Sequence, residues 1–168
     1  MMTVRRQIHA RRSPRLRGFA YDSPGAYFVT ACISRRRPIL AAVSSSGTVR
    51  LTEAGHIVNA TWESLSARFP GVTTDVFIVM PDHVHGIVWI EGDDDVKRES
   101  GRSRPGLTDV MSAFKSISAR RANAALGSAG RQVWQRSFYD RVIRTERELL
   151  VAREYIVDNP MAFAIGGA

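Results

Sequence analysis

The chain of 168 residues is long enough to bury a hydrophobic core, and we expect it to form one domain. Its hydrophobic content of 44% and charged content of 24% are ordinary for a globular protein, and no apolar run approaches the roughly 18 residues that a membrane span needs. The single cysteine, Cys32, excludes an internal disulfide framework. The basic start of the chain lacks the apolar stretch of a secretory signal, so we expect a cytoplasmic protein that makes no membrane contact.

The net charge of +8 is distributed unevenly along the chain. Residues 1–50 contain ten arginines and one acidic residue, whereas residues 51–168 contain 14 basic and 15 acidic side chains. Arginine binds phosphate oxygens through its planar fork and stacks on bases, so the first segment favours a nucleic-acid contact. A solvated basic tail explains the same charge equally well, and charge alone does not choose between the two interpretations.

The first part of the chain predicts an arm, a strand, a hairpin and a helix. Residues 1–18 lack apolar periodicity and form the arm, whereas the aromatic and β-branched segment 26–34 is typical of a strand. Residues 39–50 predict a small hairpin around "SSSG". A helix should follow Thr52 and end at Pro70-Gly71, because small or apolar residues recur at helical spacing at Ala54, Val58, Thr61, Leu65 and Phe69.

The remaining chain predicts two strands, a helix, a further strand and a final helix. The strands are 74–80 and 86–90, followed by a polar loop over 91–106. Thr108 should cap a helix whose inner face is Val110, Phe114 and Ile117, and residues 137–144 alternate like a strand. The last helix should begin at the capping box Thr145–Glu148, bury Leu149, Ala152 and Ile156, and end at Pro160.

The order of these elements predicts the fold class. Strand, helix, strand, strand, helix, strand and helix form the ferredoxin-like pattern with an added C-terminal helix. We therefore predict an α+β fold in which an antiparallel sheet carries helices on one face. Many unrelated functions use this fold, so the function must be argued from the site.

The stretch "PDHVHGI" contains two histidines that are one residue apart. On a strand, His83 and His85 point to the same face while Val84 points to the opposite one. Two imidazoles are too few for a stable metal site, so a further donor must come from elsewhere. An isolated H-x-H is common, and Asp82 is free to cap or orient a neighbour. The spacing alone leaves metal binding open.

The last helix contains a second candidate group in "REYIVDNP". Tyr155 and Asn159 are four residues apart and therefore share one helix face, with Asn159 expected at the frayed end before Pro160. If this helix crosses the histidine strand, Asn159 would complete a metal site beside Tyr155. A tyrosine that only packs on the sheet explains the pattern as well.

Four sequence blocks together resemble a known family. They are "RRSPRLRGFAYDSPGAYFVTAC", "VFIVMPDHVHGIVWI", "SAFKS" and "VWQRSFYDRVIRTERELLVAREYIVDNP". In this order they are similar to the REP-associated tyrosine transposases, which belong to the single-tyrosine HUH transposases of bacterial insertion sequences. The resemblance runs from about residue 11 to residue 161, nearly the whole chain.

The resemblance implies specific roles for the site residues. His83, His85 and Asn159 would ligate Mg²⁺ or Mn²⁺, and Tyr155 would be the nucleophile. The family cleaves and rejoins single-stranded DNA near hairpin repeats through a 5′-phosphotyrosine intermediate. Its members are homodimers in the bacterial cytoplasm, associated with the nucleoid when bound to DNA.

The resemblance also implies a division of the chain into an Arg-rich arm, residues 1–18, and a single HUH-type catalytic domain, residues 19–168. The arm and the surface near the last strand would contact the hairpin. The expected DNA-binding residues are Arg11, Arg12, Arg15, Arg17, Lys115, Trp134 and Arg136. Trp134 either stacks on a base or stabilises its own loop.

Several competing assignments stay open from the residues alone. Tyr139 is a second candidate nucleophile, and either it or Phe138 must face the core. His9 and His56 are expected to be bystanders, and the acidic run at 93–95 is expected to be a solvated loop. Two other functions are also considered: a non-catalytic nucleic-acid-binding protein on the same fold, and a metal-dependent hydrolase that activates water.

Overall fold

The computed structural model describes residues 23–92 and 105–166. The predicted arm with Arg11, Arg12, Arg15 and Arg17, together with His9 and the acidic run at 93–95, lies outside the described residues. In chain order the elements are β1 (Gly25–Cys32), η1 (Ser34–Arg36), β2 (Ala41–Val43), β3 (Val49–Leu51), α1 (Glu53–Glu63), α2 (Leu65–Arg68), β4 (Val72–Val79), β5 (His83–Ile90), α4 (Leu107–Ala125), β6 (Tyr139–Ile143) and α5 (Glu146–Gly166).

A four-stranded sheet in the order β4-β5-β1-β6 forms the centre of the fold. Every neighbouring pair of strands is antiparallel, which together with this order is the ferredoxin-like arrangement. Strands β2 and β3 pair separately as a small hairpin. The predicted fold class and the predicted hairpin are therefore confirmed.

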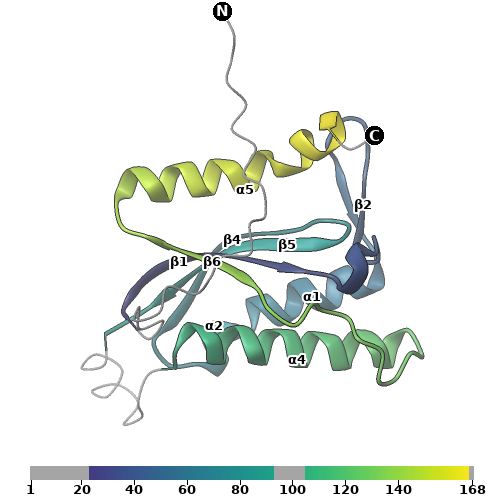
Figure 1. Cartoon of the computed structure of the whole chain (residues 1–168), viewed down its shortest axis with the longest axis horizontal. Helices are drawn as coiled ribbons and strands as arrows, with labels where there is room; N and C mark the ends of the chain where they lie inside the picture. The colour runs from purple at the N-terminus through teal and green to yellow at the C-terminus, as the bar shows by residue number, and fades with distance from the viewer. Residues whose placement is uncertain (1–22, 93–104, 167–168) are drawn as a thin grey trace, which may run out of the picture.

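The two faces of the sheet are covered by different helices (Figure 1). Helices α1, α2 and α4 lie on one face, and α5 crosses the other. Because side chains alternate along a strand, β5 sends Val84, Val88 and Ile90 into the larger core. Ile87 and Trp89 point to the opposite side, where Ile87 packs in a smaller apolar cluster with Ile156 of α5.

A carboxylate on β4 ties α5 to the sheet. Asp75 accepts hydrogen bonds from Nε of Arg153 at 3.2 Å and from its Nη2 at 2.6 Å, and from the Trp89 indole at 3.1 Å. Burial alone would raise the pKa of Asp75, but these hydrogen bonds outweigh burial and hold the pKa below its ordinary value of 3.8. Arg153 lies two residues before Tyr155, so this ion pair helps to fix α5 near that tyrosine.

The end of α5 differs from the prediction. The helix continues through Pro160 to Gly166, although proline provides no N–H for the carbonyl of Ile156. Pro160 is buried, and the following turn packs on the β2–β3 hairpin, where a Cβ at Gly47 would lie 3.1 Å from Cα of Met161. Contact with the hairpin thus holds the helix beyond the proline, and Asn159 lies within the helix rather than at a frayed end.

Two other helix boundaries also differ from the prediction. Helix α4 is capped by Gly106, whose backbone N–H donates to Asp109 Oδ2 at 3.0 Å, and not by Thr108. The helix after Thr52 is divided at Ser64 into α1 and α2. The predicted caps Thr52 and Thr145 are confirmed, since each hydroxyl accepts a backbone N–H three residues further on.

Within the described parts of the chain, no helix is long and apolar enough to cross a membrane.

Replacing Gly86 by alanine should destabilise the protein. A Cβ at this position would lie 2.5 Å from Trp62 Cζ2 and 2.9 Å from Phe77 Cδ2, and those two rings are stacked with their centroids 4.3 Å apart. We expect Gly86→Ala to lower the free energy of unfolding by about 1–3 kcal/mol in urea titrations. Gly166→Ala, which meets open space in a helix, is the control and should leave the stability equal or slightly higher. Equal stabilities of the two variants would contradict this packing.

Replacing Asp75 by asparagine should destabilise the protein in a pH-dependent way. We expect a loss of about 1–2 kcal/mol at neutral pH, because the ion pair with Arg153 is removed. A lowered folded-state pKa means that the ionised carboxylate contributes stability above its unfolded pKa and loses it as pH falls through the folded pKa. The difference between wild type and Asp75→Asn in urea midpoints should therefore be constant near neutral pH and shrink below about pH 4. A difference that does not change with pH would argue against the ion pair.

Candidate active site

The two histidines lie side by side at the start of β5. Both point to the face that α5 covers, and their ring centroids are 4.7 Å apart. The exposed fractions are 9% for His83 and 5% for His85, so both imidazoles are largely removed from water. The stretch "HVHGI" belongs entirely to the strand, which makes the i, i+2 geometry strict.

Each histidine is held through its Nδ1 atom. Asp82 lies 2.6 Å from Nδ1 of His83, and the hydroxyl of Thr30 lies 2.7 Å from Nδ1 of His85. Hydrogen bonds from His83 outweigh the effect of burial and keep the pKa of Asp82 below its ordinary value, so this carboxylate is ionised and accepts the His83 proton. With its Nδ1 protonated, His83 has a free lone pair on Nε2, and His85 has the same option.

His85 is neutral over the physiological pH range. Burial is the main cause that lowers its pKa to about 3, and electrostatic interactions with His83 and Arg36 add to the effect. A neutral imidazole is the form that ligates metals.

Helix α5 brings Tyr155 directly to these histidines. Its ring centroid lies 5.3 Å from that of His85 and 5.8 Å from that of Phe28, with edge-on geometry in both pairs. Burial raises the pKa of the phenol, and a hydrogen bond from Asn159 partly opposes this effect. The structure thus brings Tyr155 to the histidine pair, with Asn159 one helical turn further along α5, and metal binding by Asn159 stays a prediction.

The donor set of this site fits a divalent metal ion. Two imidazoles that are held through Nδ1 leave their Nε2 atoms free, and the side-chain amide of Asn159 adds a carbonyl oxygen. The described residues contain no group of three or more His, Cys, Asp or Glu side chains that could hold a metal by themselves, so the amide is needed. A nitrogen-rich set of this kind suits Mn²⁺ better than Mg²⁺.

Tyr139 lies on the same face of the sheet but farther from the histidines. It pairs with Thr30, and Thr30 pairs with His85, so two strand spacings of roughly 5 Å each separate the two residues. Phe138 packs against the larger core, in agreement with the expectation that either Phe138 or Tyr139 faces it. Tyr155, whose ring contacts His85, is therefore the better placed of the two tyrosines.

Trp134 does not occupy the position that base stacking requires. It is 5% exposed, it packs near Phe114, and its indole N–H donates to Ser118 at 3.0 Å. The expectation that Trp134 stacks on DNA is therefore corrected. The ring is part of the hydrophobic core and stabilises its own loop. His56 is exposed on α1, as expected of a bystander.

Lys115 and Arg136 lie together near this loop. Nζ of Lys115 donates to the carbonyls of Arg136 at 2.9 Å and Ser137 at 3.3 Å, and burial lowers its pKa. Lys115 therefore supports the chain before β6, while the Arg136 side chain is exposed. A DNA contact by either residue stays a prediction.

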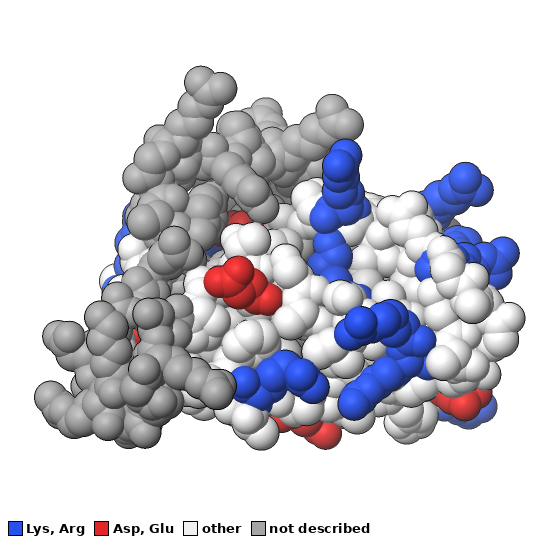
Figure 2. All heavy atoms as spheres, turned by 90° about the horizontal axis from the view of Figure 1, so that it is seen from below, with Lys and Arg blue, Asp and Glu red and all other residues white. Residues whose placement is uncertain are grey.

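A basic surface was missed because charge was counted over too long a segment. Residues 110–138 contain five basic side chains and no acidic one, namely Lys115, Arg120, Arg121, Arg131 and Arg136. The face of the molecule seen from below carries several separate groups of Lys and Arg and few acidic side chains (Figure 2). Counting charge in windows of about 30 residues would have revealed this excess.

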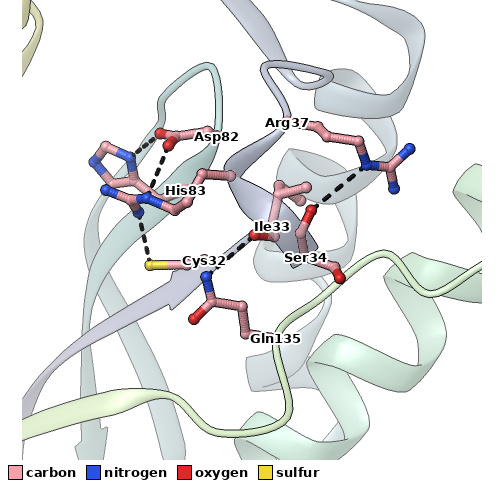
Figure 3. A network of polar contacts seen from close by, with 8 residues as sticks. Cys32, Ile33, Ser34, Arg37, Asp82, His83 and Gln135 are labelled. Atoms are coloured by element: carbon pink, nitrogen blue, oxygen red, sulfur yellow. Dashed lines mark hydrogen bonds and ion pairs between the residues drawn. The ribbon is translucent and has the colours of Figure 1, made fainter. Parts of the chain in front are cut away.

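The sequence analysis also missed a polar network around Asp82 (Figure 3). Besides His83, Asp82 binds Nε of Arg36 at 3.0 Å, and Nη1 of Arg36 donates to Cys32 Sγ at 2.9 Å. Burial raises the pKa of the Cys32 thiol, so the sulfur remains protonated at neutral pH. The only sequence signal was the position of Asp82 beside the histidine pair.

Comparisons with known proteins identify one sequence relative of the chain and solved structures that share its fold. No model of a known protein family matches the chain. The chain is 32% identical over 164 residues to an uncharacterized protein of Haemophilus influenzae, covering 92% of this chain and 90% of that protein.

Two solved structures share the fold. A REP-associated tyrosine transposase bound to a REP hairpin has a TM-score of 0.55 and 19% identity, over 85% of this chain and 70% of that one. A "putative transposase" of Deinococcus radiodurans R1 has a TM-score of 0.53 and 17% identity, over 86% of this chain and 95% of that one. The chain therefore belongs to the family of the Haemophilus influenzae protein, and it has the fold of these transposase structures.

Proposed function

We propose that this protein is a metal-dependent tyrosine transposase that cleaves and rejoins single-stranded DNA beside hairpin repeats. The observation that carries the proposal is the contact between Tyr155 and His85, with ring centroids 5.3 Å apart, in a single chain. The proposed nucleophile lies there beside two imidazoles that are held through Nδ1, and a likeness in fold to a hairpin-bound transposase supports DNA as the substrate.

The chain's own residues account for the main step of the reaction. The phenol oxygen of Tyr155 forms a bond to the scissile phosphorus while the bond from phosphorus to the 3′-oxygen breaks. The phenol loses its proton, and the departing 3′-oxygen gains one, which leaves a 5′-phosphotyrosine and a free 3′-hydroxyl. The ester keeps the energy of the broken bond, so a second 3′-hydroxyl can reverse the step and join a new strand.

The protein prepares the site in two ways. His83 and His85 are fixed through Nδ1 by Asp82 and Thr30, which sets their free nitrogens before any substrate binds. Burial raises the pKa of the Tyr155 phenol, and the Asn159 amide opposes this rise and so helps to form the phenolate needed for attack. A divalent ion held by His83, His85 and Asn159 would polarise a phosphate oxygen and neutralise developing charge.

Basic side chains supply the DNA contacts in this proposal. The surface of Lys115, Arg120, Arg121, Arg131 and Arg136 carries positive charge without acidic neighbours in sequence, which suits a phosphate backbone. The arm arginines, Arg11, Arg12, Arg15 and Arg17, remain predicted hairpin contacts, and a homodimer likewise remains a prediction. The runner-up is a nucleic-acid-binding protein without catalysis, which the same basic surface would also serve.

Tyr155→Phe should abolish formation of a covalent protein–DNA adduct. The substrate is a labelled oligonucleotide copying a palindrome beside the coding region, incubated with Mn²⁺ and separated by denaturing electrophoresis. The phenol oxygen is the attacking atom, so we expect no adduct from this variant but unchanged DNA affinity. Tyr139→Phe is the matched control and should form adduct at the wild-type rate. Adduct with Tyr155→Phe would overturn the assignment, and binding without adduct in wild type would favour the runner-up.

Removal of divalent metal should stop adduct formation without releasing DNA. We expect a chelator to abolish the adduct, and Mn²⁺ to restore it at lower concentration than Mg²⁺ because the donor set is rich in nitrogen. In calorimetric titrations without DNA, His85→Ala should weaken Mn²⁺ binding at least about tenfold. His56→Ala removes an exposed histidine from α1 and should bind Mn²⁺ as wild type does. Equal affinities of the two variants would argue against metal at this site.

A further inference from the structure

The turn after β1 contains two arginines in an unfavourable backbone conformation. Arg35 has φ of 58° and Arg36 has φ of 52°, and they are the two non-glycine residues with positive φ among those the structure describes. An L-residue with a long side chain rarely adopts this left-handed region, and such outliers gather at ligand clamps and active sites. The turn therefore calls for an explanation in terms of what it positions.

Hydrogen bonds on both sides hold the turn in place. The backbone N–H of Ile33 donates to the Asp82 carbonyl at 2.8 Å, and that of Ser34 donates to the Val133 carbonyl at 2.7 Å. Arg37 follows the turn and donates to the Gln132 carbonyl at 3.2 Å. The surrounding chain thus fixes a conformation that arginine would not adopt by itself.

The turn folds the Arg36 side chain over the histidine face of the sheet. Cys32 pairs with His83 in the strand register, and its side chain lies on the same face as Phe28 and Thr30 by strand alternation. The guanidinium binds Cys32 Sγ at 2.9 Å and Asp82 Oδ2 at 3.0 Å, and the other oxygen of Asp82 binds His83.

The ion pair with Asp82 does not by itself account for the strained turn. The Arg36 side chain is 54% exposed, and exposed ion pairs contribute little to stability. Asp82 occupies Nε of Arg36 and Cys32 occupies one N–H of Nη1, while no described residue accepts a hydrogen bond from Nη2. A fixed, half-exposed cation with free N–H groups beside the proposed metal site is what an incoming phosphate would bind.

We propose that Arg36 binds the scissile phosphate as a second cation of the active site, and that Asp82 positions both Arg36 and His83. The proposal rests on the proposed DNA cleavage and adds a residue to it. The free N–H groups of Arg36 donate to non-bridging phosphate oxygens, whose charge increases as Tyr155 attacks. Asp82 uses one oxygen for each partner, so a single carboxylate sets the distance between the guanidinium and the histidine pair.

The test compares Arg36→Gly with Arg35→Gly. Both variants remove one charge from the same turn, and both replace an arginine at positive φ by the residue that tolerates it, so both should unfold at the wild-type temperature or higher. We expect only Arg36→Gly to slow adduct formation, by about 10²–10³-fold, with Arg36→Lys intermediate because its point charge lacks the fork. Equal adduct rates in the two glycine variants, or a large loss of thermal stability in Arg36→Gly alone, would overturn the proposal.

A second measurement separates this proposal from the proposed function. Affinity for a labelled 20-nucleotide single strand is measured in chelator over a range of salt concentrations, where catalysis plays no part. Arg36→Gly should reduce the slope of log affinity against log salt by about one contact, and Arg35→Gly should leave it unchanged. If wild type forms no Tyr155 adduct, the proposed function fails, and the salt slope still decides whether Arg36 binds phosphate.

The role of Asp82 is tested by measuring Mn²⁺ affinity rather than DNA affinity or cleavage. Asp82→Asn keeps the shape but loses the charge that holds the His83 proton, and it should weaken Mn²⁺ binding in the DNA-free protein by about 10–100-fold. Arg36→Gly leaves Asp82 in place and should bind Mn²⁺ within about twofold of wild type. Unchanged Mn²⁺ affinity in Asp82→Asn would overturn the positioning role of this carboxylate.

Discussion

The packing of α5 across one face of the sheet is the interaction on which the site depends. Leu149, Ala152 and Ile156 bury an apolar stripe against Phe28 and Ile87. This apolar contact covers the sheet face that carries the histidines. The ion pair between Asp75 and Arg153 fixes the helix against the same face. Burial under the helix is also the largest cause of the lowered pKa of His85. The same contact therefore brings the phenol to the imidazoles and keeps an imidazole in its neutral form.

The two-residue period of β5 lets one short stretch serve both faces of the sheet. His83 and His85 form the site, whereas Val84 and Gly86 lie against the larger core. Gly86 has no room for a side chain because the Trp62 ring occupies that space. A shift of one residue in the pairing would place valine at the site and bury the imidazoles among aromatic rings. Core packing on one face thus maintains the register that the proposed site needs on the other.

Local patterns predicted the elements, while contacts between distant segments decided where the prediction was wrong. The capping residues Thr52 and Thr145 and the alternation around the histidines act within a few residues, and each was found as expected. Pro160 was expected to end α5, but the β2–β3 hairpin, more than 100 residues earlier, supports the helix beyond it. For Trp134 the sequence left open whether it stacks on a base or stabilises its own loop, and the hydrogen bond from its buried indole to Ser118 of α4 favours the second role. Arg36 reaches Asp82 only through a left-handed turn, which an arginine sequence does not predict.

The network around Asp82 also bears on the choice between strand transfer and hydrolysis. A metal-dependent hydrolase needs a base that takes a proton from water, and a carboxylate beside the metal commonly fills this role. Asp82 is the carboxylate adjacent to the histidines, but one of its oxygens binds His83 and the other binds Arg36. Its pKa lies below the ordinary value, which makes it a weaker base still. Tyr155, in contrast, already contacts His85, and although burial raises the pKa of its phenol, Asn159 opposes that rise. With the carboxylate engaged and a phenol beside His85, the arrangement supports the proposed tyrosine ester over hydrolysis of a phosphodiester.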